Sequence, residues 1–148
     1  MDLEYLSKVD NLKSKVLKYI TFKKRTEKEV YQRFSNEDRE LLEEVVEYLK
    51  EAGYIDDKDY VERAINEFIA LKNLSNFELR YKLLSKGISK DDIDDYFNKN
   101  EEKLKEYEII SAKNIIEKKS KTMEKEDIKN YLLRKNYSYE SIRQIEDI

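Results

Sequence analysis

Apolar residues recur at intervals of three and four along most of the chain, with charged residues between them. One such stripe runs from Tyr60 to Ile69, and another runs from Leu41 to Leu49. This spacing places the apolar side chains on one face of an α-helix. The pattern therefore predicts helices at about 7–22, 26–34, 37–52, 75–86, 89–98, 101–120, 124–135 and 138–148, with one more helix carrying the stripe at 60–69.

The run GYIDDKDYVERAI at 53–65 fits a joint between two of these helices. Asp56 is suited to the N-cap, and Asp59 to the third helical position, from which it can reach back. Ile55 and Tyr60 have the spacing of a hydrophobic staple. Gly53 fits the left-handed residue that ends the preceding helix. A capped helix joint explains each unusual residue of the run.

The same acidic run has a second interpretation, in which Asp56, Asp57 and Asp59 bind a cation. The spacing loosely resembles a calcium-binding loop. The glycine and the distant glutamate that such a loop requires are out of place here. The sequence therefore favours the structural interpretation and predicts no metal site.

Similar joints recur with an offset of 49 residues. Gly87 and Ser89 correspond to Asn136 and Ser138, and Thr26 precedes another predicted helix in the way that Ser75 does. Aligned triplets share residue type: Glu29, Glu78 and Asp127; Val30, Leu79 and Ile128; Phe34, Leu83 and Leu132. These matches predict three tandem three-helix repeats at 1–55, 56–99 and 100–148, each similar to a helix-turn-helix unit.

One repeat of this size buries too little apolar surface to be stable by itself. Stacking the repeats would cover the remaining apolar faces, so we expect an all-α, elongated and curved right-angled stack. The composition agrees, because the chain has no proline and only two glycines and therefore lacks the residues of tight β-hairpins.

The residues that are absent narrow the chemistry. The chain has no cysteine and no histidine, which excludes disulfides, the usual structural zinc sites and histidine-activated nucleophiles. Adjacent acids such as Asp91 and Asp92 have no opposed partner in a predicted water-poor pocket. We therefore expect no catalytic residue and no cofactor. With no apolar stretch near the ~20 residues of a membrane span and no signal peptide, the sequence predicts a soluble cytoplasmic protein.

Charge is distributed unevenly along the chain, whose net charge is −3. Residues 1–36 and 111–135 each carry +4, whereas residues 37–59 carry −7. A dedicated binder of duplex DNA is usually basic overall. The charge pattern favours a protein partner or a mixed surface.

Four motifs in order resemble the RecX family, which regulates the RecA recombinase. They are LKYITFKKRTEKEVYQRF at 17–34, YLKEAGYIDDKDYVERAI at 48–65, ELRYKLLSKGIS at 78–89 and YLLRKNYSYESI at 131–142. The resemblance covers roughly residues 12–145. Two positions depart from the pattern: Asn136 stands where glycine is common, and Glu124, a weak capping residue, occupies the N-cap position of the third repeat.

The resemblance implies a monomeric module of three repeats that docks in the helical groove of a RecA filament on single-stranded DNA. Such a module would lower the recombinase, ATPase and coprotease activities of the filament in DNA repair and the SOS response. Candidate contacts to acidic protein surface or DNA phosphate are Lys24, Arg25, Arg33, Arg80, Lys82, Lys118, Lys119, Lys121, Arg134 and Lys135.

Two other interpretations of these residues stay open. The basic side chains can be solvated helix faces that form ion pairs four residues apart. Alternatively, the basic clusters at 23–25 and 118–121 can serve a helical protein that binds DNA without a partner. The many tyrosines fit the edges of a core, with an aromatic platform for single-stranded nucleic acid as the rival interpretation.

Overall fold

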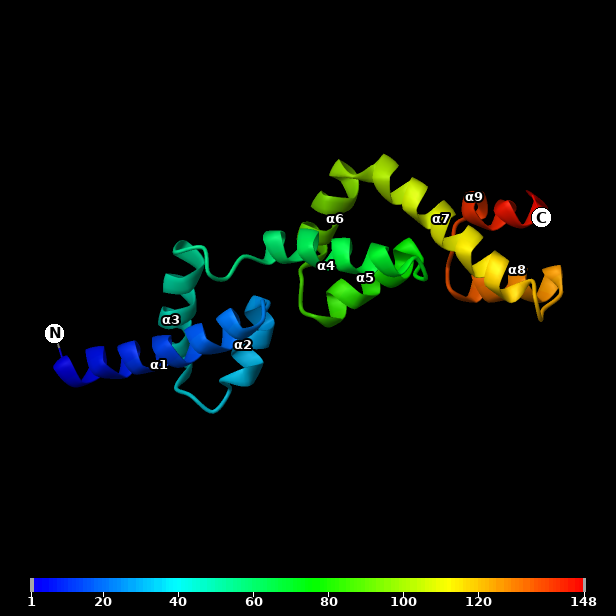
Figure 1. Cartoon of the computed structure of the whole chain (residues 1–148). Helices are drawn as coiled ribbons and strands as arrows, with labels where there is room; N and C mark the ends of the chain where they lie inside the picture. Colours follow the sequence, from blue (N-terminus) through cyan, green and yellow to red (C-terminus); the bar gives the residue numbers. More distant parts are fainter. Residues whose placement is uncertain (1, 148) are drawn as a thin grey trace. The chain divides into compact units, whose positions relative to one another are not determined.

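All regular secondary structure within residues 2–147, which are the residues that the computed structural model describes, is helical (Figure 1). The all-α fold class is therefore confirmed. The elements in chain order are α1 (Leu3–Phe22), α2 (Glu27–Arg33), α3 (Arg39–Glu51), α4 (Asp57–Leu71), α5 (Asn76–Ser85), α6 (Lys90–Lys99), α7 (Glu101–Lys119), α8 (Lys125–Arg134), α9 (Tyr139–Ile142) and the 3₁₀ helix η1 (Arg143–Asp147).

The chain forms two compact units. The first extends to Tyr60 and also contains the short segment Lys86–Ile88, while the second contains Val61–Ser85 and the chain from Ser89 onward. The sequence-based division at 1–55, 56–99 and 100–148 stays a prediction.

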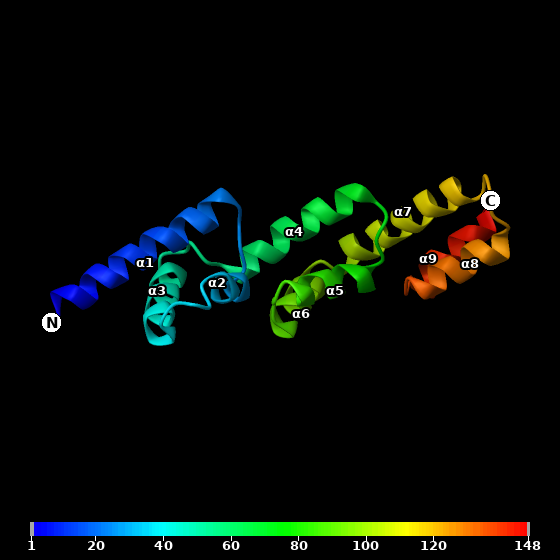
Figure 2. The same ribbon diagram turned by 90° about the horizontal axis from the view of Figure 1, so that it is seen from below.

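In the first unit, α1 and α2 pack against α3 (Figure 2). The core between them contains Val16, Val30, Val45 and Leu49, none of which has measurable exposure. Asp2 caps α1 by accepting a hydrogen bond from the backbone N–H of Glu4 at 2.9 Å. Because of this cap, α1 begins at Leu3, one turn before the predicted start at residue 7.

The hydroxyl of Thr26, at a fully buried position, joins the segment Lys86–Ile88 to the start of α2. Its oxygen accepts from the backbone N–H of Glu29 at 3.1 Å and donates to the carbonyl of Lys86 at 2.7 Å. The Glu29 carboxylate in turn accepts from the backbone N–H of Thr26 at 3.0 Å, which completes a capping box. These bonds explain why Lys86–Ile88 belongs to the first unit.

The second unit repeats this arrangement with serine in place of threonine. Ser75, also fully buried, accepts from the backbone N–H of Glu78 at 3.1 Å and donates to the carbonyl of Lys135 at 2.6 Å. In both units the bond from hydroxyl to carbonyl joins residues 60 positions apart. The match supports the 49-residue period proposed from the sequence, because both partners shift by that number.

The predicted helix ends are largely confirmed. Gly53, Gly87 and Asn136 have φ angles of 83°, 90° and 63°, in the left-handed region expected of a residue that follows a helix. Glu124 makes no capping hydrogen bond, as expected of a weak capping residue. The predicted cap hydrogen bonds form at Asp56, Ser89 and Ser138.

The last predicted helix, 138–148, differs from the structure. Only Tyr139–Ile142 is α-helical, and the chain continues as the 3₁₀ helix η1 to Asp147. Ile148 lies outside the described residues. Both α9 and η1 pack against α7, where Ile142 and Ile145 complete a core with Ile116, Ile128 and Leu132. The tighter 3₁₀ turns, which are common at helix ends, accompany this packing of Ile145.

We expect Gly87→Ala to destabilise the protein more than Gly53→Ala. Both glycines have positive φ, so alanine at either costs about 1–2 kcal/mol in backbone strain. A methyl group at Gly87 would also overlap the Cβ, Cγ and Cδ of Lys28, whereas the space around Gly53 is open. Urea unfolding followed by circular dichroism measures both changes. Equal losses of unfolding free energy would contradict the predicted clash.

Candidate protein-binding surface

The acidic run at the start of α4 is occupied by structural interactions. The Asp56 side chain accepts from the backbone N–H of Asp59 at 3.1 Å. Asp57 accepts from the backbone N–H of Glu27 at 3.0 Å, and Asp59 lies 3.7 Å from the ammonium of Lys24. No group of three acidic side chains that could hold a metal ion occurs within residues 2–147. The run is therefore a helix joint, as the cap and staple spacing predicts.

The three candidate contacts of the first unit are largely engaged within it. Lys24 pairs with Asp59, and Arg25 pairs with Glu29 at 3.8 Å while its guanidinium lies 4.4 Å from the ring centre of Tyr19. Arg33 is exposed and lies 5.8 Å from the same ring. The Arg25 side chain is 21% exposed and packs within the first unit, and its role in binding stays a prediction.

In the second unit, α5 and the C-terminal end of α8 border a surface hollow of about 530 Å³. Three of the predicted contacts, Lys82, Arg134 and Lys135, line it together with Phe77 and Tyr81. We call this feature the α5–α8 hollow. It unites cations from two segments that are about 50 residues apart in the sequence.

The cations of the α5–α8 hollow differ in how they are held. Lys135 pairs with Glu78 at 3.4 Å, and its ammonium lies 5.8 Å from the ring centre of Tyr131. Lys82 lies 5.7 Å from the ring centre of Phe68. Arg134 is exposed, and none of the carboxylates in the described part of the chain lies within ion-pair distance of it. Arg134 is thus available to a partner.

The lysines near the C-terminal end of α7 do not line this hollow. Lys118 and Lys121 are exposed to solvent. The ammonium of Lys119, on α7, lies 4.1 Å from the ring centre of Tyr131. Lys135, which follows α8, approaches the same ring. Tyr131 therefore lies between Lys119 and Lys135, and Lys135 belongs to the α5–α8 hollow.

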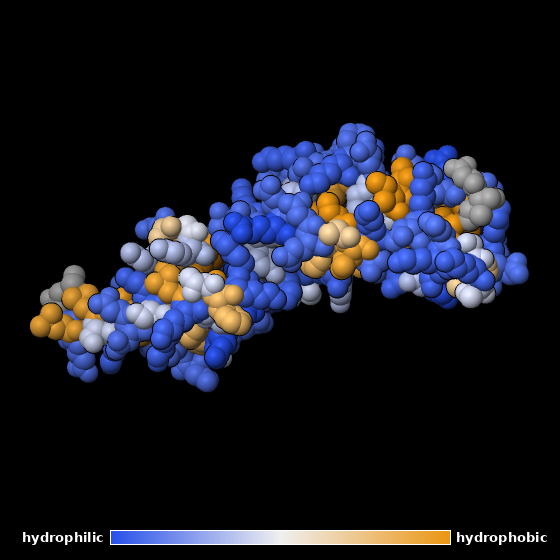
Figure 3. Space-filling model, in the orientation of Figure 1, coloured by the Kyte–Doolittle hydropathy of each residue, from blue (hydrophilic) through white to orange (hydrophobic). Residues whose placement is uncertain are grey.

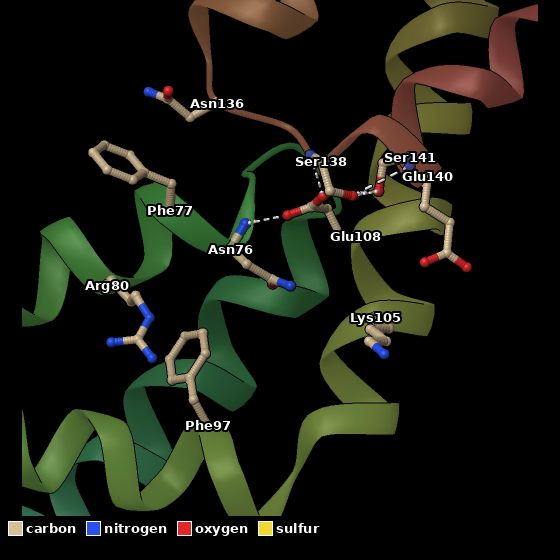
Figure 4. A pocket seen from close by; sticks show the side chains of 10 residues that line it. All are labelled: Asn76, Phe77, Arg80, Phe97, Lys105, Glu108, Asn136, Ser138, Glu140 and Ser141. Atoms are coloured by element: carbon tan, nitrogen blue, oxygen red, sulfur yellow. Dashed lines mark hydrogen bonds between the residues drawn. The ribbon is translucent and has the colours of Figure 1, made fainter.

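A second hollow, of about 380 Å³, adjoins the first and shares Phe77 and Asn136 with it (Figure 4). The predicted contact Arg80 lies here. Its guanidinium donates to Asp94 at 2.6 Å and lies 4.3 Å from the ring centre of Phe97. The Arg80 hydrogen bond lowers the pKa of the Asp94 carboxyl, so this pair stays charged. Arg80 joins α5 to α6 and is less free than Arg134.

The floor of the second hollow contains a carboxylate that the sequence did not suggest as important. Glu108, on α7, is 4% exposed. It accepts from the backbone N–H of Asn76 at 2.9 Å, from that of Ser138 at 2.8 Å and from the hydroxyl of Ser141 at 2.8 Å (Figure 4). Its charge lies at the N-terminal ends of both α5 and α9, where a helix dipole favours an anion.

Two buried tyrosines continue this polar layer. The hydroxyl of Tyr107 donates to the carbonyl of Leu74 at 2.7 Å, and that of Tyr137 lies 2.7 Å from the hydroxyl of Ser111. Burial raises the pKa of both phenols above the usual value of about 10, so both stay protonated near neutral pH. The sequence predicts buried tyrosine rings at the core edge with solvated hydroxyls; these two rings are buried, but their hydroxyls bond to the protein.

The aromatic side chains of the α5–α8 hollow, Phe77 and Tyr81, are not among the contacts predicted from the sequence. Phe77 and Tyr81 are 53% and 66% exposed. Figure 3 shows a largely hydrophilic surface that is interrupted by apolar patches. The 49-residue period could have identified them, because the first repeat has the polar residues Lys28 and Gln32 where this repeat has aromatic rings.

We expect Glu108→Gln to destabilise the protein by about 1.5–3 kcal/mol, the usual worth of hydrogen bonds to a charged group. The amide presents only one acceptor oxygen, so at least one N–H or O–H donor loses its partner. Glu106→Gln is the matched control, because Glu106 is exposed on the same helix. Thermal unfolding compares the two variants, and similar midpoints would contradict the role of Glu108.

The chain was compared with protein families, curated proteins and solved structures. No family model matches it. It is 34% identical over 133 residues to the regulatory protein RecX of Staphylococcus carnosus, covering 86% of this chain and 50% of that protein. It is 34% identical over 137 residues to RecX of Finegoldia magna, covering 87% of this chain and 67% of that protein. The chain thus spans half to two thirds of the length of these relatives.

Similarity to solved structures extends over nearly the whole chain. The crystal structure of RecX from Lactobacillus salivarius matches with a TM-score of 0.78 at 22% identity, covering 96% of both chains. At this identity the structural match supports the fold, and the sequence relatives carry the family assignment. No helix within residues 2–147 is long and apolar enough to cross a membrane. With sequence and fold in agreement, the chain belongs to the RecX family of regulatory proteins.

Proposed function

We propose that this protein binds the RecA recombinase filament on single-stranded DNA and lowers its strand-exchange, ATPase and coprotease activities. Membership of the RecX family is the observation that carries the proposal. The protein acts as an inhibitor by binding and supplies no catalytic residue or cofactor. It does so as a cytoplasmic monomer whose contact surface lies around the α5–α8 hollow of the second unit.

Several features of the second unit support this assignment. The α5–α8 hollow combines aromatic side chains with cations, and this mixture is typical of the energetically important part of a protein–protein interface. Arg134 presents an exposed charge that can meet an acidic surface. Two other candidates of this unit, Arg80 and Lys119, are held by Asp94 and Tyr131 and would position the surface around it.

The proposal is tested by titrating the protein into the cognate RecA on poly(dT) and measuring ATP hydrolysis. We expect a large loss of activity well below one protein per recombinase, because a molecule that spans neighbouring subunits affects the whole filament. A folded protein with no effect at a full equivalent would overturn the proposed function. Circular dichroism establishes the folded state in the same preparation.

We expect the charge reversal Arg134→Glu to raise the concentration needed for half-inhibition about tenfold, which corresponds to about 1.4 kcal/mol of binding free energy. Lys129→Glu is the control, because it makes the same sign of change on an exposed side chain of the same helix. The control is expected to inhibit like the wild type. Equal inhibition by both variants would remove Arg134 from the contact surface.

A further inference from the structure

The α5 helix leaves a row of apolar side chains in solvent. Phe77, Tyr81 and Leu84 are 53%, 66% and 48% exposed and occupy positions i, i+4 and i+7. Residues at this spacing lie on one face of a helix. We call this row the α5 stripe. Single exposed apolar residues are ordinary, but a contiguous row of them marks an interaction site.

The fold does not require the α5 stripe. At the positions of Phe77 and Tyr81, the first repeat has Lys28 and Gln32. The third repeat has Glu126 and Asn130 at those positions, and all four of these polar residues are exposed. The helices α2 and α8 form with polar side chains at the equivalent positions, so the fold does not need the two aromatic rings of α5. A role in binding accounts for them.

Cations border the α5 stripe on the side of α8. The α5–α8 hollow is lined by Lys82, Arg134 and Lys135. Phe77 and Tyr81 of the stripe line the same hollow. The surface therefore offers an apolar row with a positive rim. A partner surface complementary to it is an apolar groove with carboxylates along one edge.

We propose that the α5 stripe is the anchor of the protein interface, with Phe77 and Tyr81 inserted into an apolar, acid-rimmed groove of the partner protein. The inference rests on the proposed function, which makes that partner the recombinase. Phe77 and Tyr81 supply the buried area, and Arg134 with Lys82 sets the orientation against the acidic rim. Aromatic and arginine side chains of this kind supply most of the energy in protein interfaces.

The charge of the second unit favours protein over nucleic acid as the occupant. Residues 61–85 and 89–148 carry 17 basic and 18 acidic side chains, so the unit lacks the positive excess that tracks a phosphate backbone. Glu78 lines the α5–α8 hollow, and Leu84 extends the stripe with an aliphatic side chain that offers no ring for stacking. The carboxylate disfavours a phosphate backbone, and the aliphatic side chain suits an apolar protein groove.

The experiment compares the double variant Phe77→Ala/Tyr81→Ala with Phe22→Ala/Tyr139→Ala. The control removes the same two side-chain types from positions that are 87% and 79% exposed and lie outside the stripe. Inhibition of RecA ATPase on poly(dT) is measured for the wild type and both variants. Anisotropy of fluorescein-labelled oligo(dT) without recombinase measures direct DNA binding, and thermal unfolding checks the fold.

We expect the stripe variant to need at least about tenfold more protein for half-inhibition, since loss of a buried aromatic anchor costs 1.4 kcal/mol or more. The control variant is expected to match the wild type, and all three proteins to unfold at similar temperatures. Weaker inhibition by the stripe variant with unchanged binding to oligo(dT) would support the inference.

Three results would overturn the inference, and each is distinguishable. Equal inhibition by all three proteins would remove the stripe while leaving the proposed function intact. Absence of inhibition by the wild type would remove the proposed function and the inference together. A parallel loss of inhibition and of oligo(dT) binding in the stripe variant would assign the two rings to nucleic acid in place of protein.

Discussion

A buried hydroxyl group at the start of a short helix is the contact on which the architecture depends. Thr26 in the first unit and Ser75 in the second each accept from a free backbone N–H and donate to a carbonyl 60 residues later. Each hydroxyl thereby satisfies a donor of one segment and an acceptor of another. A buried donor or acceptor without a hydrogen-bond partner costs about 1–3 kcal/mol of stability. Because moving the later segment would leave such groups unpaired, the bond fixes the position of that segment.

In the second unit, a buried carboxylate extends the same principle. Glu108 receives hydrogen bonds from the beginnings of two helices, α5 and α9, while its own helix supplies the core side chains Ala112, Ile115 and Ile116. The short α9 has only four residues and cannot be stable by itself. Its place is determined by the Glu108 carboxylate on the polar side and by Ile142 and Ile145 on the apolar side.

These polar contacts leave other surfaces free for binding. The helix α5 is fixed at its beginning by Ser75 and Asn76 and across its length by the buried Leu79 and Leu83. Its opposite face can therefore present Phe77 and Tyr81 to solvent without weakening the fold. The proposed role of these rings as anchors fits a rigid helix, because such a helix loses little conformational entropy on binding.

The sequence by itself determined most of the helices, their caps and their period, but not the change from α-helix to 3₁₀ helix after Ile142. Each of these depends on residues near in the chain: the left-handed ends at Gly53, Gly87 and Asn136 were predictable because only neighbouring backbone atoms constrain φ there. The period also allowed the equivalence of Thr26 with Ser75 to be recognised. The start of α1 was missed because the Asp2 cap lies ahead of the first strong apolar stripe.

The tertiary structure alone decided which of the charged and aromatic residues serve the fold and which face solvent. Lys135 and Arg134 are adjacent in sequence, yet one pairs with Glu78 and the other is open, because helix rotation directs their side chains differently. Glu108 resembles the other acids of α7 in sequence and is buried only because α5 and α9 begin against it. Burial of a polar group depends on partners distant in the chain, and a local pattern contains no information about them.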